Sequence, residues 1–208
     1  MGKPRKKGNR PAKRNGDGED RISNLADDII NRILSVLPDT KFAAQTAVLS
    51  KRWETLWTSV PDLRFSAKNY KSKESFKEFL LSALQRREQN CEICNLCLFI
   101  DYGHLDRQRA PHKEYFLEEV QLRDLVVKYA VRHGVRHIDL SHPYAQLYPV
   151  PLALSGCRTL TTLKLAQLIV TEMPTACFPA VKTLYLDDCD FDGDFVVTRN
   201  PLSPISHT

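Results

Sequence analysis

The stretch Leu160-Thr-Thr-Leu163-Lys-Leu165 has the pattern apolar-x-x-apolar-x-apolar, whose last two positions lie on one face of a strand. Three other stretches show the same pattern. They are Ile93/Leu96/Leu98, Val135/Ile138/Leu140 and Val181/Leu184/Leu186. Ile138 and Leu163 are 25 positions apart, and Leu163 and Leu184 are 21 apart. A pattern that recurs at nearly regular intervals predicts repeated strands stacked side by side in a solenoid.

The last copy comes nearest to a known repeat template, because it continues as Leu186-x-x-Cys189-x-Phe191. This nearly completes the leucine-rich repeat, whose period is about 20–29 residues. The interval between the first two copies is longer, and we expect a helix to fill it, with Gly134 at its C-terminal end. The apolar positions of this helix are Phe116, Val120, Val126, Val127, Ala130 and Val131.

Alternate residues of each predicted strand turn outward, because side chains alternate between the two faces of a sheet. The outward residues of the four strands are Cys97, Asp139, Lys164 and Tyr185, flanked by His137, Thr162, Thr183 and Asp187. They form either a merely solvated face or a surface that binds another protein.

Residues 21–57 have the apolar spacing of three short helices. Ser23 or Asn24 can cap the first, which ends before Pro38. Thr40 opens the second, and Ser50 caps the third, which covers residues 51–57. A fourth, amphipathic helix follows the capping-box pattern Ser75-x-x-Glu78 and ends near residues 86–88.

Several of these segments resemble the F-box of a large plant family that joins this motif to leucine-rich repeats. The matching segments are Asp20–Ile29, Ile33–Pro38, Thr46–Trp53 and Leu56-Trp57. Val150–Leu165 and Phe178–Leu186 resemble the repeat segments of the same family. The resemblance implies an α+β fold, with a three-helix F-box followed by a short α/β solenoid of leucine-rich repeats. It divides the chain into a disordered basic tail (1–19), an F-box (20–60), a linker helix region (61–92), repeats (93–192) and an irregular C-terminal tail (193–208).

The same resemblance implies a non-catalytic, substrate-recruiting subunit of a Skp–cullin–F-box ubiquitin ligase. The F-box would dock on the Skp-family adaptor, and through it on a cullin, while the repeats present an unknown protein substrate. The implied adaptor-binding residues are Leu25, Ala26, Asp28, Ile29, Ile33, Leu37, Val48 and Trp53, of which Val48 and Trp53 are expected to be partly core. The implied target-binding residues are Asp139, Lys164 and Tyr185.

Two features of the sequence depart from the family pattern. Ala26 stands where the family usually has proline, a residue suited to the first turn of a helix, so we expect weaker adaptor binding. The residues after Asp194 show no repeat, so the repeat region is expected to be truncated. A second hypothesis is therefore that the chain is a decoy, which occupies the adaptor and recruits no target.

The charge of the chain is concentrated at its N-terminus. Of 208 residues, 30 are Lys or Arg and 25 are Asp or Glu, a net charge of +5. The first 14 residues carry seven basic residues and no acidic one, so the remainder sums to −2. The basic residues are Lys3, Arg5, Lys6, Lys7, Arg10, Lys13 and Arg14. We interpret Lys3, Arg5, Lys6, Lys7, Lys13 and Arg14 as a nuclear import signal, with a nucleic-acid tether or a solvated tail as alternatives.

Composition and motifs exclude several other classes. No apolar run approaches the roughly 20 residues that a membrane span needs, and the slightly acidic remainder argues against a nucleic-acid partner. The absence of a signal peptide favours the nucleus or the cytoplasm, and reduced thiols. Cys91-x-x-Cys94-x-x-Cys97, with His104 and His112, resembles a zinc motif, but Cys94 and Cys97 would point to opposite faces of a strand. We therefore expect no metal, no cofactor and no catalytic residues.

Overall fold

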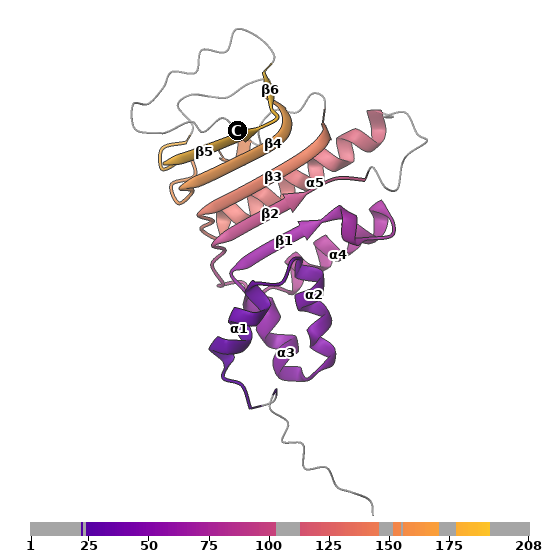
Figure 1. The fold of residues 1–208 in the computed structure, drawn as a ribbon, viewed down its shortest axis with the longest axis vertical. Coiled ribbons are helices and arrows are strands. Elements are labelled where there is room, and N and C mark those ends of the chain that lie inside the picture. Colours follow the sequence, from indigo (N-terminus) through magenta and orange to yellow (C-terminus); the bar gives the residue numbers. More distant parts are fainter. Residues whose placement is uncertain are drawn as a thin grey trace, which may run out of the picture.

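The computed structural model describes residues 22, 24–102, 113–145, 152–154, 156–170 and 178–191. A group of short helices lies at one end of these residues, and a parallel sheet backed by two longer helices makes up the rest (Figure 1). The combination of helices and a parallel sheet confirms the predicted α+β composition. Among the described residues, none of the helices has both the length and the apolar character needed to span a bilayer.

The N-terminal helices, which we call the helical unit, are α1 (Asp27–Ser35), α2 (Thr40–Gln45) and α3 (Lys51–Leu56). Short 3-10 helices at Thr46–Val48 and Trp57–Ser59 extend α2 and α3. Ser50 caps α3 as predicted, its hydroxyl accepting a hydrogen bond from the Trp53 amide. The predicted cap of α1 at Ser23 or Asn24 is wrong: the helix begins at Asp27, and its N-cap is Ala26, which has no side-chain acceptor.

Within the described residues the sheet has six strands, of which the first five run in sequence order, each parallel to the next. They are β1 (Asp62–Ser66), β2 (Asn95–Phe99), β3 (His137–Ala145), β4 (Thr162–Val170) and β5 (Thr183–Asp187), and a short β6 (Asp190–Phe191) pairs with the end of β4. The four predicted strands are therefore confirmed as neighbours. The sheet also begins one strand earlier than expected, because β1 lies in the segment predicted to be a helical linker.

Equivalent residues of β1 to β5 form rows across the first five positions of the sheet, before the register of β3 and β4 shifts between Ser141 and Ala145. Two inward rows are apolar: Leu63, Leu96, Ile138, Leu163 and Leu184, and then Phe65, Leu98, Leu140, Leu165 and Leu186. From β1 to β4 these side chains are almost completely buried. Burying such rows is the main stabilising contribution to the sheet, at about 25 cal/mol for each Å² of apolar surface removed from water.

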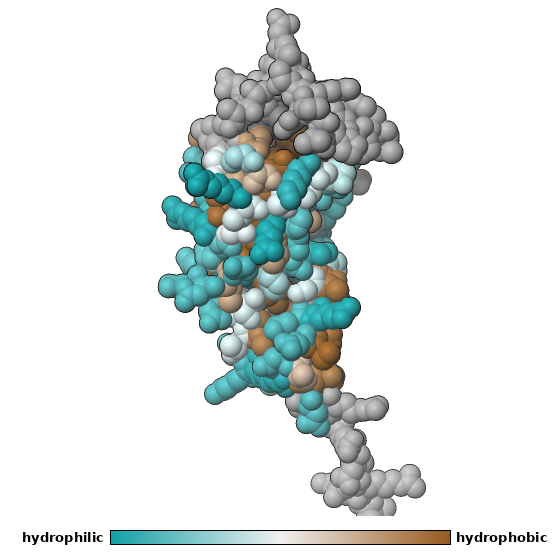
Figure 2. Space-filling model, turned by 90° about the vertical axis from the view of Figure 1, so that its left-hand side faces the viewer, coloured by the Kyte–Doolittle hydropathy of each residue, from teal (hydrophilic) through white to brown (hydrophobic). Residues whose placement is uncertain are grey.

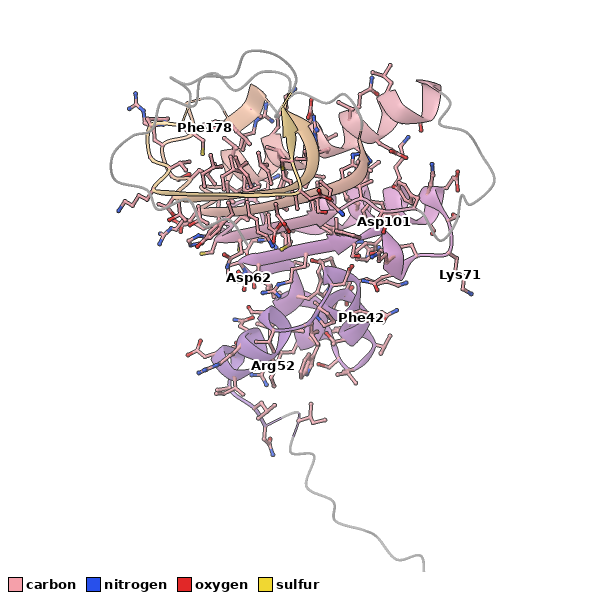
Figure 3. The ribbon with its side chains drawn as sticks, turned by 45° about the horizontal axis from the view of Figure 1, so that its top comes forward. Phe42, Arg52, Asp62, Lys71, Asp101 and Phe178 are labelled. Atoms are coloured by element: carbon pink, nitrogen blue, oxygen red, sulfur yellow. The ribbon has the colours of Figure 1, made fainter. Side chains whose placement is uncertain are left out.

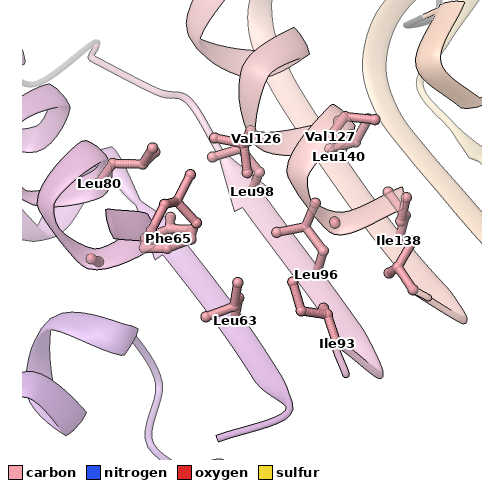
Figure 4. Packing of buried hydrophobic residues seen from close by; sticks show 14 of the residues in the cluster. Leu63, Phe65, Leu80, Ile93, Leu96, Leu98, Val126, Val127, Ile138 and Leu140 are labelled. Atoms are coloured by element: carbon pink, nitrogen blue, oxygen red, sulfur yellow. The ribbon is translucent and has the colours of Figure 1, made fainter. Parts of the chain in front are cut away.

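Two helices cover the inward face of the sheet. They are α4 (Lys73–Arg86) and α5 (Lys113–Arg132). Figure 4 shows Leu80 of α4 near Phe65, and Val126 and Val127 of α5 beside Leu98 and Leu140. Gly134 ends α5 as predicted and has a φ of 77°, which favours glycine. The predicted capping box of α4 is displaced by one turn, because Ser72 is the N-cap and Ser75 lies at its third helical position.

Three consecutive residues, the N-cap and the first two residues of α2, join the helical unit to the sheet. The Asp39 carboxylate accepts hydrogen bonds from the backbone amide of Ser66, at 2.9 Å, and from Asn69 Nδ2, at 2.8 Å. The Thr40 hydroxyl accepts one from the Arg64 amide at 2.9 Å. Lys41 Nζ donates to the Asn69 carbonyl at 2.6 Å. We call these contacts the joint.

Candidate docking surfaces

The first candidate surface is an apolar stripe on α1. Ile29, Ile33 and Val36 are 48%, 39% and 70% exposed, although they are large aliphatic residues. Their spacing places them on one side of the helix, while Ile30 and Leu34 on the other side are buried in the core. We call these three residues the docking face. Contiguous exposed apolar residues on a small unit are typical of protein–protein contacts.

An ion pair between helices ties the start of α1, which has no side-chain cap, to α3. Arg52 of α3 donates to the Asp27 carboxylate and to the backbone carbonyl of Leu25. Figure 3 shows Arg52 and Phe42 on the helical unit, on the far side of β1 from the other strands. Because both helices are tied at this point, the docking face is presented on a fixed helix.

More apolar surface lies at the other turns of the helical unit. Val48 is 89% exposed, and Leu49, Phe42 and Ile22 are also exposed. Figure 2 shows hydrophobic surface gathered toward the end of the molecule that holds the helical unit. The expectation that Val48 is partly core is wrong, because the 3-10 turn at Thr46–Val48 points this side chain into solvent.

The remaining residues of the implied adaptor set divide by burial. Ala26 and Asp28 are exposed at the start of α1. Leu25 and Leu37 are half-buried and pack against the core. Trp53 is 5% exposed, so it is a core residue and offers a partner little surface. Sequence reasoning omitted Val36, although its spacing of three from Ile33 would have placed it on the docking face.

The second candidate surface is the outward face of the sheet. Its central row, which we call the outward row, consists of Arg64, Cys97, Asp139, Lys164 and Tyr185. Asp139 and Lys164 form an ion pair at 3.3 Å, and Tyr185 is 45% exposed. The structure therefore places all three implied target-binding residues in adjacent register positions. Sequence reasoning missed Arg64, which belongs to the strand that it did not predict.

The flanking residues of this face are small and polar. One neighbouring row consists of Asp62, Asn95, His137, Thr162 and Thr183, and Asn95 Nδ2 donates to the Asp62 carboxylate. Burial, followed by the Asp139 carboxylate, raises the pKa of the Cys97 thiol. A thiol with a raised pKa is a poorer nucleophile at neutral pH than an ordinary thiol.

The zinc-like cysteine motif does not form a cluster in the described part of the chain. No group of three or more metal-ligating side chains occurs among the described residues. His104 and His112 lie outside them, as do the six import-signal residues Lys3, Arg5, Lys6, Lys7, Lys13 and Arg14. Two histidines, His133 and His137, lie four residues apart but in different elements. The His133 ring stacks on the Tyr129 ring, with 4.1 Å between the ring centroids, whereas His137 lies on β3.

Comparison with known proteins finds relatives in Arabidopsis thaliana. An F-box protein is 31% identical over 187 residues, which are 88% of this chain and 43% of the relative. An F-box/LRR-repeat protein is 32% identical over 187 residues, 87% of this chain and 56% of the relative. A putative F-box/FBD/LRR-repeat protein is 30% identical over 183 residues, 88% of this chain and 38% of the relative. The chain thus spans about half or less of the length of these curated relatives. No family model and no solved structure matches it.

Proposed function

We propose that the chain, which belongs to the plant family of F-box proteins with leucine-rich repeats, recruits substrates to a Skp–cullin–F-box ubiquitin ligase. The helical unit is the F-box, and it docks on a Skp-family adaptor that connects it to a cullin. The sheet is the repeat region, and it begins at β1. The chain contributes no catalytic group; it raises the local concentration of a target near a ubiquitin-charged enzyme.

The observation that carries this proposal is the exposed apolar docking face. Ile29, Ile33 and Val36 keep 39–70% of their surface in solvent, whereas complete burial of one exposed aliphatic side chain is worth about 1.5–3 kcal/mol. The relatives are named for the F-box, and the matched segments include the residues of α1. An adaptor bound through this face leaves the outward face of the sheet open for a target.

The outward row supports target binding by its chemistry. It presents Arg64, the Asp139–Lys164 pair and the Tyr185 ring. Exposed tyrosine and arginine are the side chains most enriched at the centres of protein–protein interfaces. The basic N-terminal segment supports import into the nucleus, so we place the protein in the nucleus, the cytoplasm or both.

Co-purification with a plant Skp adaptor, followed by calorimetric titration, tests the first half of the proposal. We expect Ile29→Asp/Ile33→Asp to lower adaptor affinity by about 100-fold or more, because two charges then enter an apolar contact. A matched control is Leu117→Asp/Leu125→Asp, which alters two exposed leucines of α5. The control should leave affinity unchanged.

Two further outcomes refine the proposal. A gain in affinity for Ala26→Pro would show that the departure from the family pattern weakens docking. A folded native chain that fails to bind, with no rescue by proline, would overturn the adaptor role. Adaptor binding without ubiquitination of any bound protein would instead favour the decoy.

A further inference from the structure

The edge of the sheet next to the helical unit is closed by side chains. β1 pairs with β2 on one side only, which would leave alternate backbone amides open on its other side. The amides of Arg64 and Ser66 instead donate to Thr40 Oγ1 and Asp39 Oδ2, both at 2.9 Å. The helical unit therefore takes the place of a further strand at this edge.

Asp39 is the centre of this arrangement. Only 1% exposed, it also accepts a hydrogen bond from the Lys41 amide at 2.8 Å, which caps α2. The Tyr70 hydroxyl donates a longer hydrogen bond, of 3.5 Å, to Oδ1 of the Asp39 carboxylate. Burial first, and then the Asp39 carboxylate, raises the pKa of Tyr70 well above its usual range. One carboxylate thus holds its own helix, the end of β1 and the turn that follows.

The contacts at the joint have a direction that the apolar contacts beside it lack. A hydrogen bond weakens steeply as its angle departs from linear, whereas apolar burial is non-directional. The core next to the joint, which includes Leu34, Trp57 and Leu63, holds the helical unit and the sheet together. The hydrogen bonds of the joint add a directional restraint to this packing.

We propose that Asp39 is a positioning residue that sets the direction in which the outward face points away from the adaptor-bound helices. This inference rests on the proposed function, since that direction determines which lysines come near a ubiquitin-charged enzyme. Loss of the Asp39 carboxylate removes the cap of α2 together with the bonds to Ser66 and Asn69. The docking face on α1 is left in place, and the sheet becomes free to reorient relative to the helices.

Residual dipolar couplings of the full chain test the joint without an adaptor. In the native chain, one alignment tensor should fit the amides of α3 and of β2–β4 together. In Asp39→Ala we expect two tensors, and faster hydrogen exchange at the Ser66 amide. The matched control, Asp62→Asn, alters a carboxylate on β1 that bonds to Asn95 within the sheet, and it should keep one tensor. One tensor and unchanged Ser66 exchange in Asp39→Ala would overturn the proposal.

A second variant keeps the test decisive if Asp39→Ala does not fold. Thr40→Val has nearly the same shape and removes only the acceptor of the Arg64 amide. We expect a folded protein with faster exchange at Arg64 and a less accurate single-tensor fit. Native exchange at Arg64 together with a native fit would count against the joint.

Ubiquitin transfer to the chain itself, in a complex reconstituted with the Skp adaptor and cullin, tests the consequence. Lys182 is an exposed lysine directly before β5, and Lys51 is an exposed lysine of α3. We expect the ratio of modification at Lys182 to that at Lys51 to change by about threefold or more in Asp39→Ala, with native adaptor affinity. An unchanged ratio would overturn the positioning role. A native chain that binds no adaptor would instead overturn the proposed function and leave the joint standing.

Discussion

The helical unit and the sheet use apolar residues in opposite ways. The inward rows of the sheet bury almost all of their leucines, isoleucines and phenylalanine, and the outward row is mostly polar or charged. The helical unit buries Ile30 and Leu34 but leaves Ile29 and Ile33 partly exposed, and Val36 and Val48 mostly exposed. Apolar residues in the sheet therefore specify the fold, whereas those on the helical unit exceed what its fold needs. That excess is the physical sign of a missing partner.

The largest expected effect separates these two uses directly. Leu96→Ala removes a core side chain that is 1% exposed, and it should lower the free energy of unfolding by about 2–5 kcal/mol. Val48→Ala removes a side chain that is almost fully exposed, and it should change that free energy by less than about 0.5 kcal/mol. Urea denaturation of the two variants measures the difference. Equal losses would contradict the division between fold and partner.

The second prediction concerns the loss of stability at alkaline pH that two buried tyrosines cause. Burial raises the pKa of Tyr70 and of Tyr102, with further contributions from Asp39 and from Glu119 respectively. The unfolded chain ionises its tyrosines near pH 10, so it releases these protons before the folded chain does. Stability should therefore be complete below about pH 10 and fall as the pH rises above that value.

Unfolding at pH 9 and pH 11 checks this expectation. Tyr70→Phe/Tyr102→Phe should show a smaller loss between the two pH values than the native chain. Tyr185→Phe alters an exposed ring and serves as the control. A native-sized loss in the double variant would show that other groups cause the alkaline sensitivity.

The capping of α4 gives a smaller effect on the sheet side. The Ser72 hydroxyl accepts a hydrogen bond from the Ser75 amide at 3.1 Å. In return, the Ser72 amide donates to the Ser75 hydroxyl at 3.2 Å. Ser72→Ala should cost about 1 kcal/mol of stability, whereas Ser72→Thr should retain most of it. Thermal unfolding of both variants measures the contrast, and equal losses would show that the hydroxyl does not act as a cap.

The smallest effect concerns the exposed ion pair of the outward row. A double-mutant cycle with Asp139→Asn and Lys164→Met should give a coupling of about 0.2–1 kcal/mol, because both side chains are substantially exposed. The coupling should shrink in 1 M salt, where the screening length is about 3 Å. A coupling above this range, or one insensitive to salt, would mean that the pair stabilises the sheet and is not reserved for a target.

The periodicity of apolar residues predicts four adjacent strands of the sheet, and the strand it leaves out is β1. Val60, Leu63 and Phe65 have the same spacing as the four recognised copies, but they directly follow the helices and were assigned to the linker. All three are buried, and they place β1 beside β2. The strand could have been predicted from the existing pattern, without any new signal.

The joint could not be predicted in the same way. Nothing in the sequence around Asp39 distinguishes an ordinary helix cap from a carboxylate that also binds a strand 27 residues later. Caps depend on local sequence, whereas this second role depends on tertiary placement. The same limit applies to α1, which begins at Asp27 without the cap expected at Ser23 or Asn24 and whose start is tied by Arg52 from another helix.

The joint can form only late in the synthesis of this part of the chain. The partners of Asp39 outside its own helix lie 27 to 31 residues downstream of it. At about 5–20 residues per second, the ribosome adds that length in about 1 to 6 seconds. For that interval the newly made helices have a carboxylate without its strand and an apolar face without its partner. Nascent-chain chaperones would meet the segment in this state. The arrival of residues 64–70 gives the carboxylate its partners, whereas the apolar face stays exposed in the folded chain.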